Sequence, residues 1–76
     1  MKAFILLKVR GDHRSFMGKL SKFNEIEHVY NIAGDNDVLI EAKIKNLGEF
    51  KELINRVRSM ENALETTSYI VLSRYK

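Results

Sequence analysis

Apolar and polar residues follow one another in short blocks along this chain, and the spacing within each block predicts its secondary structure. Residues 3–9, AFILLKV, form a short apolar run that predicts a strand, with both faces apolar as far as Leu7. Residues 28–33, 37–45 and 66–73 predict three more strands. Within 37–45 apolar residues alternate with polar ones, and 66–73 is rich in β-branched residues.

Two further segments repeat apolar residues at helical spacing. The first begins at Asp12, which can cap a helix, and runs to about residue 24 with a stripe at intervals of four and three, Phe16, Leu20 and Phe23. The second begins after Asn46, where an Asn followed by Glu49 matches a capping box. Its stripe comprises Leu47, Phe50, Leu53, Ile54, Val57 and Met60.

The predicted order is β-α-β-β-α-β, which indicates an α+β, ferredoxin-like βαββαβ sandwich. Right-handed crossovers place both helices on one face of a four-stranded antiparallel sheet. The other face of the first strand then presents apolar side chains, either Phe4 and Leu6 or Ile5 and Leu7. Removing each such side chain from water is worth roughly 1.5–3 kcal/mol, so we expect two sheets to pair face to face in a homodimer.

Composition supports self-association. A chain of 76 residues makes one domain, and a domain of this size buries only about 60–65% of the surface that its unfolded form exposes. Small domains commonly gain further stability from disulfides, metals or association. The chain has no Cys, which excludes disulfides and thiolate zinc sites and leaves association.

Charge gives little sign of a nucleic-acid or membrane partner. The net charge is +3, with Lys and Arg interspersed among acidic residues. RNA-recognition modules share this element order and stack bases on aromatics of the first and third strands, but residues 37–45 contain no aromatic. The apolar run at residues 3–7 is too short for a membrane span. We therefore expect a cytoplasmic protein without direct nucleic-acid or membrane binding.

The chain offers no recognisable catalytic or metal-binding pattern. His13 and His28 have no second ligand-type residue at metal spacing, and we expect both at the surface. No Ser lies in a nucleophile elbow, and no Gly-rich loop precedes a helix. The sequence predicts a protein that is not an enzyme, with no catalytic residue, metal or cofactor.

The candidate binding residues lie in a predicted turn and in the last strand. Gly34, Asp35, Asn36 and Asp37 predict a tight turn between antiparallel strands. Their carboxylates and free backbone N–H groups also suit a small zwitterion, with the N–H groups forming an anion nest. Three hydroxyls open the last strand, and they either form a solvated strand face or line a polar pocket with the turn, which Tyr30 and Tyr69 would close: Thr66, Thr67 and Ser68.

A family resemblance rests on these same segments. VYNIAGDNDVLIEAKI, an amphipathic helix and then ETTSYIVLS resemble the effector-binding module of the Lrp/AsnC regulators, the RAM domain, over residues 3–72. The most specific part is an apolar strand leading into Gly-x-x-Asp and another apolar strand. The resemblance implies the βαββαβ sandwich, dimers formed through the sheet faces, assembly typically as a tetramer of dimers (an octamer), and amino-acid effectors bound between dimers.

The resemblance also bears on partners. Full-length regulators carry an N-terminal helix-turn-helix domain, whereas this chain begins at the first strand, so we expect a single domain over residues 1–76 that acts through such regulators. Two alternatives stay open. One is an ACT-like small-molecule module, although the turn after the first strand, RGDH, lacks the Pro usual there. The other is an assembly module without a ligand.

Overall fold

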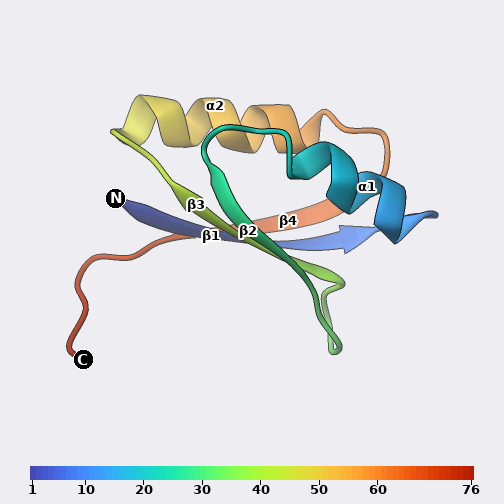
Figure 1. Cartoon of the computed structure of the whole chain (residues 1–76), viewed down its shortest axis with the longest axis horizontal. Helices are drawn as coiled ribbons and strands as arrows, with labels where there is room; N and C mark the ends of the chain where they lie inside the picture. The colour runs from blue at the N-terminus through green and yellow to red at the C-terminus, as the bar shows by residue number, and fades with distance from the viewer.

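The computed structural model describes all 76 residues and contains four strands and two helices in the predicted order. In chain order, the elements are β1 (Lys2–Val9), α1 (His13–Leu20), β2 (Ile26–Asn31), β3 (Val38–Lys43), α2 (Leu47–Arg58) and β4 (Ala63–Ile70). All three strand pairings are antiparallel, and the strand order across the sheet is β2-β3-β1-β4. Figure 1 shows both helices on one face of the sheet, so the ferredoxin-like prediction is confirmed.

Several predicted boundaries were wrong by two to four residues. Helix α1 ends at Leu20 because Lys22 and Phe23 donate their N–H groups three residues back, in turns that lead the chain to the sheet edge. Strand β2 begins at Ile26, two residues before the predicted start, because Ile26 already pairs with Ala42 of β3. Strand β4 covers Ala63–Ile70 and not residues 66–73, because it pairs with β1 over that whole length.

The core lies between the sheet and the helices. All 13 buried residues are hydrophobic, and β1 contributes every second side chain to them. This resolves the choice that the sequence left open, because Ile5 and Leu7 are fully buried under the helices whereas Phe4 and Leu6 face the other side. The buried residues are Ala3, Ile5, Leu7, Val9, Phe16, Leu20, Ile26, Val38, Ile40, Ala42, Ile44, Leu53 and Val57.

Both predicted helix caps are present. The Asp12 carboxylate accepts hydrogen bonds from the N–H groups of Arg14 and Ser15 at 3.0 and 3.2 Å. At α2 the Asn46 side chain accepts from the Glu49 N–H at 2.9 Å, and the Glu49 carboxylate accepts from the N–H of Lys45. The predicted apolar stripe of α2 needs two corrections, because Leu47 in its first turn is 59% exposed and Met60 lies beyond the end of the helix at Arg58.

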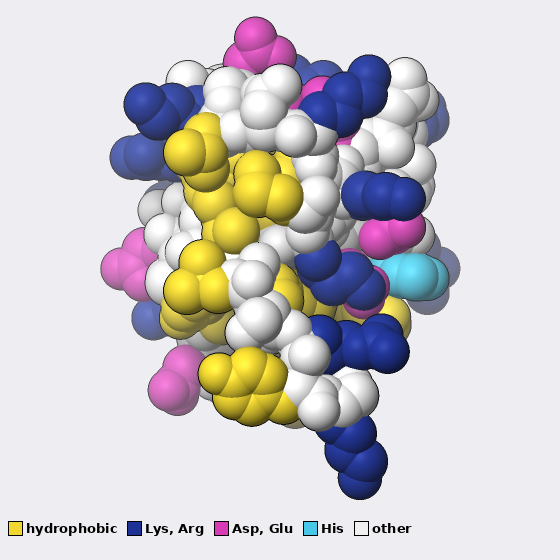
Figure 2. Space-filling model, turned by 90° about the vertical axis from the view of Figure 1, so that its left-hand side faces the viewer, with side chains coloured by type: hydrophobic (Ala, Val, Ile, Leu, Met, Phe, Trp, Pro, Cys, Tyr) yellow, Lys and Arg dark blue, Asp and Glu magenta, His cyan; other side chains and the backbone are white.

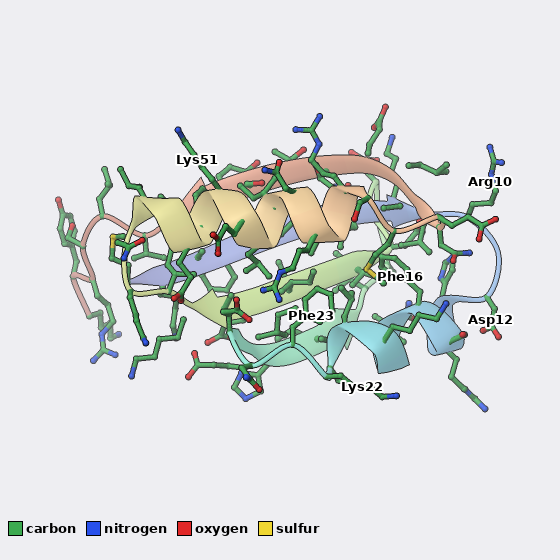
Figure 3. All side chains as sticks on the ribbon, turned by 90° about the horizontal axis from the view of Figure 1, so that it is seen from above. Arg10, Asp12, Phe16, Lys22, Phe23 and Lys51 are labelled. Atoms are coloured by element: carbon green, nitrogen blue, oxygen red, sulfur yellow. The ribbon has the colours of Figure 1, made fainter.

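The helices are also joined to each other near the α1–β2 connection. Figure 3 shows Phe16 and Phe23 lying between α1 and α2, whereas Lys51 points away from the domain. The Arg56 guanidinium lies 4.7 Å from the centre of the Phe23 ring and forms an ion pair with Glu25. This contact ties α2 to the connection that leads into β2.

Both termini lie at the same end of the molecule (Figure 1). Seen from that end, hydrophobic side chains form a strip with Lys and Arg side chains beside it (Figure 2). The last residues leave the sheet after Val71 donates its N–H to Lys2, and Leu72 and Tyr75 are each 95% exposed. Neither helix has the length and apolar character that a membrane-spanning helix requires.

Candidate functional site

The connection between β2 and β3 carries the predicted turn. It is longer than a tight hairpin, since β2 ends at Asn31 and β3 begins at Val38. Gly34 has φ of +132°, a conformation that side chains rarely adopt, and a Cβ there would meet open space. Asn36 does not use a positive φ. Figure 1 shows this connection extending from β2 and β3 toward the side opposite the helices, and Gly34 and Asp35 are exposed there.

The two carboxylates of the turn differ in their surroundings. One oxygen of Asp37 accepts the N–H of Val9 at 2.9 Å, while the Asp37 N–H donates to the carbonyl of Leu7 at 2.8 Å. Asp37 therefore extends the pairing between β1 and β3, and its carbonyl also accepts from Ile32. The Asp35 carboxylate forms no hydrogen bond or ion pair within the chain. Of the two, only Asp35 has both carboxylate oxygens without a partner within the chain.

This difference predicts opposite effects of two substitutions. Asp37→Ala should destabilise the protein by about 1–3 kcal/mol, because it leaves the part-buried N–H of Val9 without a partner. Asp35→Ala should change the free energy of unfolding by less than about 0.5 kcal/mol, because the side chain is exposed. Urea denaturation of both variants at one protein concentration measures the difference, and equal midpoints would contradict it.

The three hydroxyls of β4 do not lie on one face. Successive strand residues point to opposite sides. Thr66 and Ser68 lie opposite Leu7 and Ile5 on the helix side and are half-buried, whereas Thr67 lies on the outer face. The three side chains therefore do not share one face of the strand, although all three residues line the same hollow, which is described below.

The turn and the hydroxyls occupy the same end of the sheet but do not meet within one chain. Val38, next to the turn, and Thr66 both pair with Leu7, from opposite sides of β1. Two strand spacings, about 10 Å, separate them. The turn follows β2 at one edge of the sheet, and β4 forms the other edge. Within one chain, the turn and the hydroxyls of β4 therefore stay apart.

A hollow of about 700 Å³ lies between α2 and β4 on the helix side. It is lined by the three predicted hydroxyl residues and by Arg58, which is not among the binding residues predicted from the sequence. Arg58 lies in the last turn of α2, where a cation is common because it complements the helix dipole. The sequence alone therefore does not indicate that Arg58 binds a ligand. The lining residues are Ile54, Arg58, Ala63, Leu64, Glu65, Thr66, Thr67 and Ser68.

A second hollow, of about 640 Å³, lies between the α1–β2 connection, the β3–α2 connection and α2. It contains none of the predicted binding residues. The ion pair between Arg56 and Glu25 lies in its lining, beside the apolar Phe23 and Ile44. This region joins elements of the fold, and three lysines and two further glutamates surround it, so no single ligand charge is favoured there.

The outer face of the sheet carries a half-exposed apolar surface. Across the four strands its side chains form two rows, Tyr30–Leu39–Leu6–Thr67 and His28–Glu41–Phe4–Tyr69. We call these eight residues the outer face. Tyr30 is 44% and Tyr69 is 51% exposed, and Tyr30 stacks on His28 with ring centres 5.8 Å apart. Tyr30 therefore belongs to this surface and not to the turn.

Glu41 of the outer face pairs with Lys2, at the start of β1, and lies beside His28. Glu41 accepts a hydrogen bond from the Lys2 ammonium at 2.7 Å and lies 3.5 Å from Nδ1 of His28. The hydrogen bond from Lys2 lowers the pKa of Glu41, and the same contact raises the pKa of Lys2. Both groups stay charged near neutral pH, so a partner surface would meet a neutralised pair beside apolar side chains.

Of the two histidines expected at the surface, His28 is exposed and His13 is not fully so. His28 is at the outer face, and His13 is half-buried behind the Asp12 cap with Nε2 3.3 Å from the carbonyl oxygen of Val9. No group of three or more His, Cys, Asp or Glu side chains is arranged to hold a metal ion.

Comparison with known proteins identifies the family. The model of the Lrp/AsnC ligand binding domain matches residues 2–76. The HTH-type transcriptional regulator FL11 of Pyrococcus furiosus is 37% identical over 75 residues, which cover 97% of this chain and 50% of that protein. The chain thus spans about half the length of the curated relatives it matches.

Solved structures show the same fold. A hypothetical protein of Pyrococcus horikoshii, PHS023, superimposes with a TM-score of 0.87 at 25% identity, covering 97% of this chain and 92% of that one. The regulator NMB0573 of Neisseria meningitidis, solved as a complex with L-Met, gives 0.88 at 22% identity over 99% of this chain and 51% of its own. The chain belongs to the Lrp/AsnC family and forms its ligand-binding domain.

Proposed function

We propose that this domain binds a free amino acid and transmits its presence through self-association to transcriptional regulators of the same family. The observation that carries the proposal is the match of residues 2–76 to a ligand-binding domain. FL11, a relative that is twice as long, is named an HTH-type transcriptional regulator. The fold of NMB0573, which was solved with L-Met, is the same as the fold of this chain. A regulatory domain of this kind has no need of catalytic residues.

The turn at residues 34–37 is the proposed site of ammonium recognition. An amino acid presents an ammonium and a carboxylate one carbon apart. Asp35 is the free carboxylate of the turn, and Asp37 supports it by fixing the connection to β1. The absence of a Cβ at Gly34 leaves room for a ligand to approach the backbone beside Asp35. The hydroxyls of β4 in a neighbouring copy complete the site.

Assembly is the second half of the proposal. The outer face buries its apolar side chains when two copies pair sheet to sheet, and pairs of dimers bring a turn beside the β4 edge of a neighbouring dimer. An octamer built as a tetramer of dimers satisfies both contacts. Full-length Lrp/AsnC regulators in the cytoplasm, which carry the same kind of domain, are the proposed partners for mixed assembly.

A thermal-shift screen against the twenty proteinogenic amino acids tests the proposal. A ligand present at about 100 times its dissociation constant should stabilise the assembly by roughly 2.7 kcal/mol. Gly34→Val should abolish the shift, because a β-branched residue is strained at φ of +132° and its side chain projects where the ligand approaches. The variant should keep its dimer mass, since none of the eight residues of the outer face lies in the turn.

The controls decide how the screen is read. Asp35→Asn should weaken the shift while leaving the melting temperature of the free protein unchanged. If no amino acid raises the melting temperature of the wild-type protein, or if Gly34→Val responds as the wild type does, the amino-acid proposal is wrong.

A further inference from the structure

The hollow between α2 and β4 combines a cation, hydroxyls and an apolar floor. Ile54 and Ala63 supply apolar surface, and Thr66 and Ser68 are half-buried on the same side of β4. Its volume of about 700 Å³ exceeds what one amino acid needs, because the hollow is open to solvent on one side. A neighbouring subunit has room to close it.

Arg58 is the unpaired charge of this hollow. None of the four ion pairs and none of the side-chain hydrogen bonds of the chain involves its guanidinium. The one acidic residue in the lining, Glu65, lies 3.4 Å from the ammonium of Lys8. The planar fork of an arginine binds a carboxylate through two parallel hydrogen bonds. The hollow therefore presents a free positive group that favours an anion.

The groups around Arg58 are also free to bind. The hydroxyls of Thr66, Thr67 and Ser68 form no hydrogen bond within the chain. Strand β4 pairs only with β1, so the backbone groups along its other edge have no strand partner. The guanidinium of Arg58, the hydroxyls of Thr66 and Ser68 and the free edge of β4 thus line the same hollow.

We propose that Arg58 binds the carboxylate of the amino-acid effector in this hollow, with Thr66 and Ser68 as hydrogen-bonding partners. The proposal rests on the function proposed above, and in it two subunits bind opposite ends of the same ligand. The hollow of one subunit takes the carboxylate, and Asp35 in the turn of a neighbouring copy takes the ammonium. It replaces the N–H nest of the turn as the carboxylate site, because a carboxylate there would lie beside the unpaired Asp35 carboxylate.

Calorimetric titration of Arg58→Gln with each amino acid that binds the wild-type protein tests this assignment. The dissociation constant should rise about tenfold or more, the loss expected when a charge-assisted hydrogen bond is removed. Arg58→Lys should recover part of the affinity, because it keeps the charge. Lys51→Gln is the matched control, since Lys51 is an exposed cation of the same helix that points away from the domain (Figure 3), and it should bind as the wild type does.

A second arm changes the ligand. The amide of the same amino acid keeps the ammonium but has no carboxylate, so it should bind the wild-type protein at least about tenfold more weakly. Arg58→Gln should bind this amide with the same affinity as the wild type does, because the amide offers no carboxylate for Arg58 to hold.

Two results would overturn the assignment. If Arg58→Gln binds the amino acid with wild-type affinity, or if it lowers only the melting temperature of the free protein, Arg58 serves the helix terminus and the assignment is wrong. If the wild-type protein binds no amino acid at all, the proposed function fails, and this assignment fails with it.

Discussion

Leu53→Ala is expected to lower the free energy of unfolding by about 2–5 kcal/mol, the range for removing a large side chain from a packed core. Leu53 is fully buried in the face of α2 that covers the sheet. For a domain of 76 residues this is a large part of the total stability, because small domains are held by about 0.05–0.15 kcal/mol per residue. Part of the population should unfold at ordinary temperatures.

Glu52→Ala is the matched control for that substitution. Glu52 is the preceding residue of the same helix, is exposed, and forms no ion pair, so its removal should change stability by less than about 0.5 kcal/mol. Urea denaturation measures both variants at one protein concentration, since the apparent stability of an associating protein depends on concentration. Similar midpoints for the two variants would mean that the helix face is wrongly assigned.

Leu6→Glu is expected to convert the protein from a dimer or larger assembly into a monomer. Leu6 lies between Leu39 and Thr67 in a row of the outer face. Pairing two sheets places a second copy against this row, and an unpaired carboxylate buried there costs several kcal/mol. The side chain is only half-buried in the single chain, so the fold itself should persist.

Light scattering at micromolar concentration measures the effect. The wild-type protein should show at least twice the chain mass, and Leu6→Glu should show the chain mass of 8.8 kDa. Asn55→Glu adds the same single negative charge at an exposed position of α2 and should leave the assembly intact. A wild-type protein that is a monomer, or a Leu6→Glu variant that stays a dimer, would show that the outer face is not the contact.

The sequence predicts most of this fold because its local signals agree. Asp12 and Asn46 mark helix starts, and the apolar spacing after each gives the buried face of the helix. It leaves the orientation of β1 open, since apolar residues occupy both of its faces up to Leu7. Whether Ile5 or Phe4 is buried depends on which face of the sheet the helices cover, and only the tertiary structure shows that.

The candidate site was less predictable for the same reason. Asp35 and Asp37 have the same chemistry two residues apart, and only the contact between Asp37 and Val9, 28 residues away, separates their roles. One feature was predictable: successive side chains of a strand point to opposite faces, so Thr67 must face away from Thr66 and Ser68. Arg58 becomes a candidate only when β4 lies beside the end of α2, and no sequence spacing shows that.

Native mass spectrometry, with and without an amino acid that raises the melting temperature, tests most directly whether the ligand binds between subunits. The assembly model predicts that bound amino acid appears only on species larger than a dimer, and that adding it increases the share of those species. Leu6→Glu should bind none under the same conditions. Bound amino acid on the monomer, or on isolated dimers at the same occupancy, would contradict a site shared between dimers.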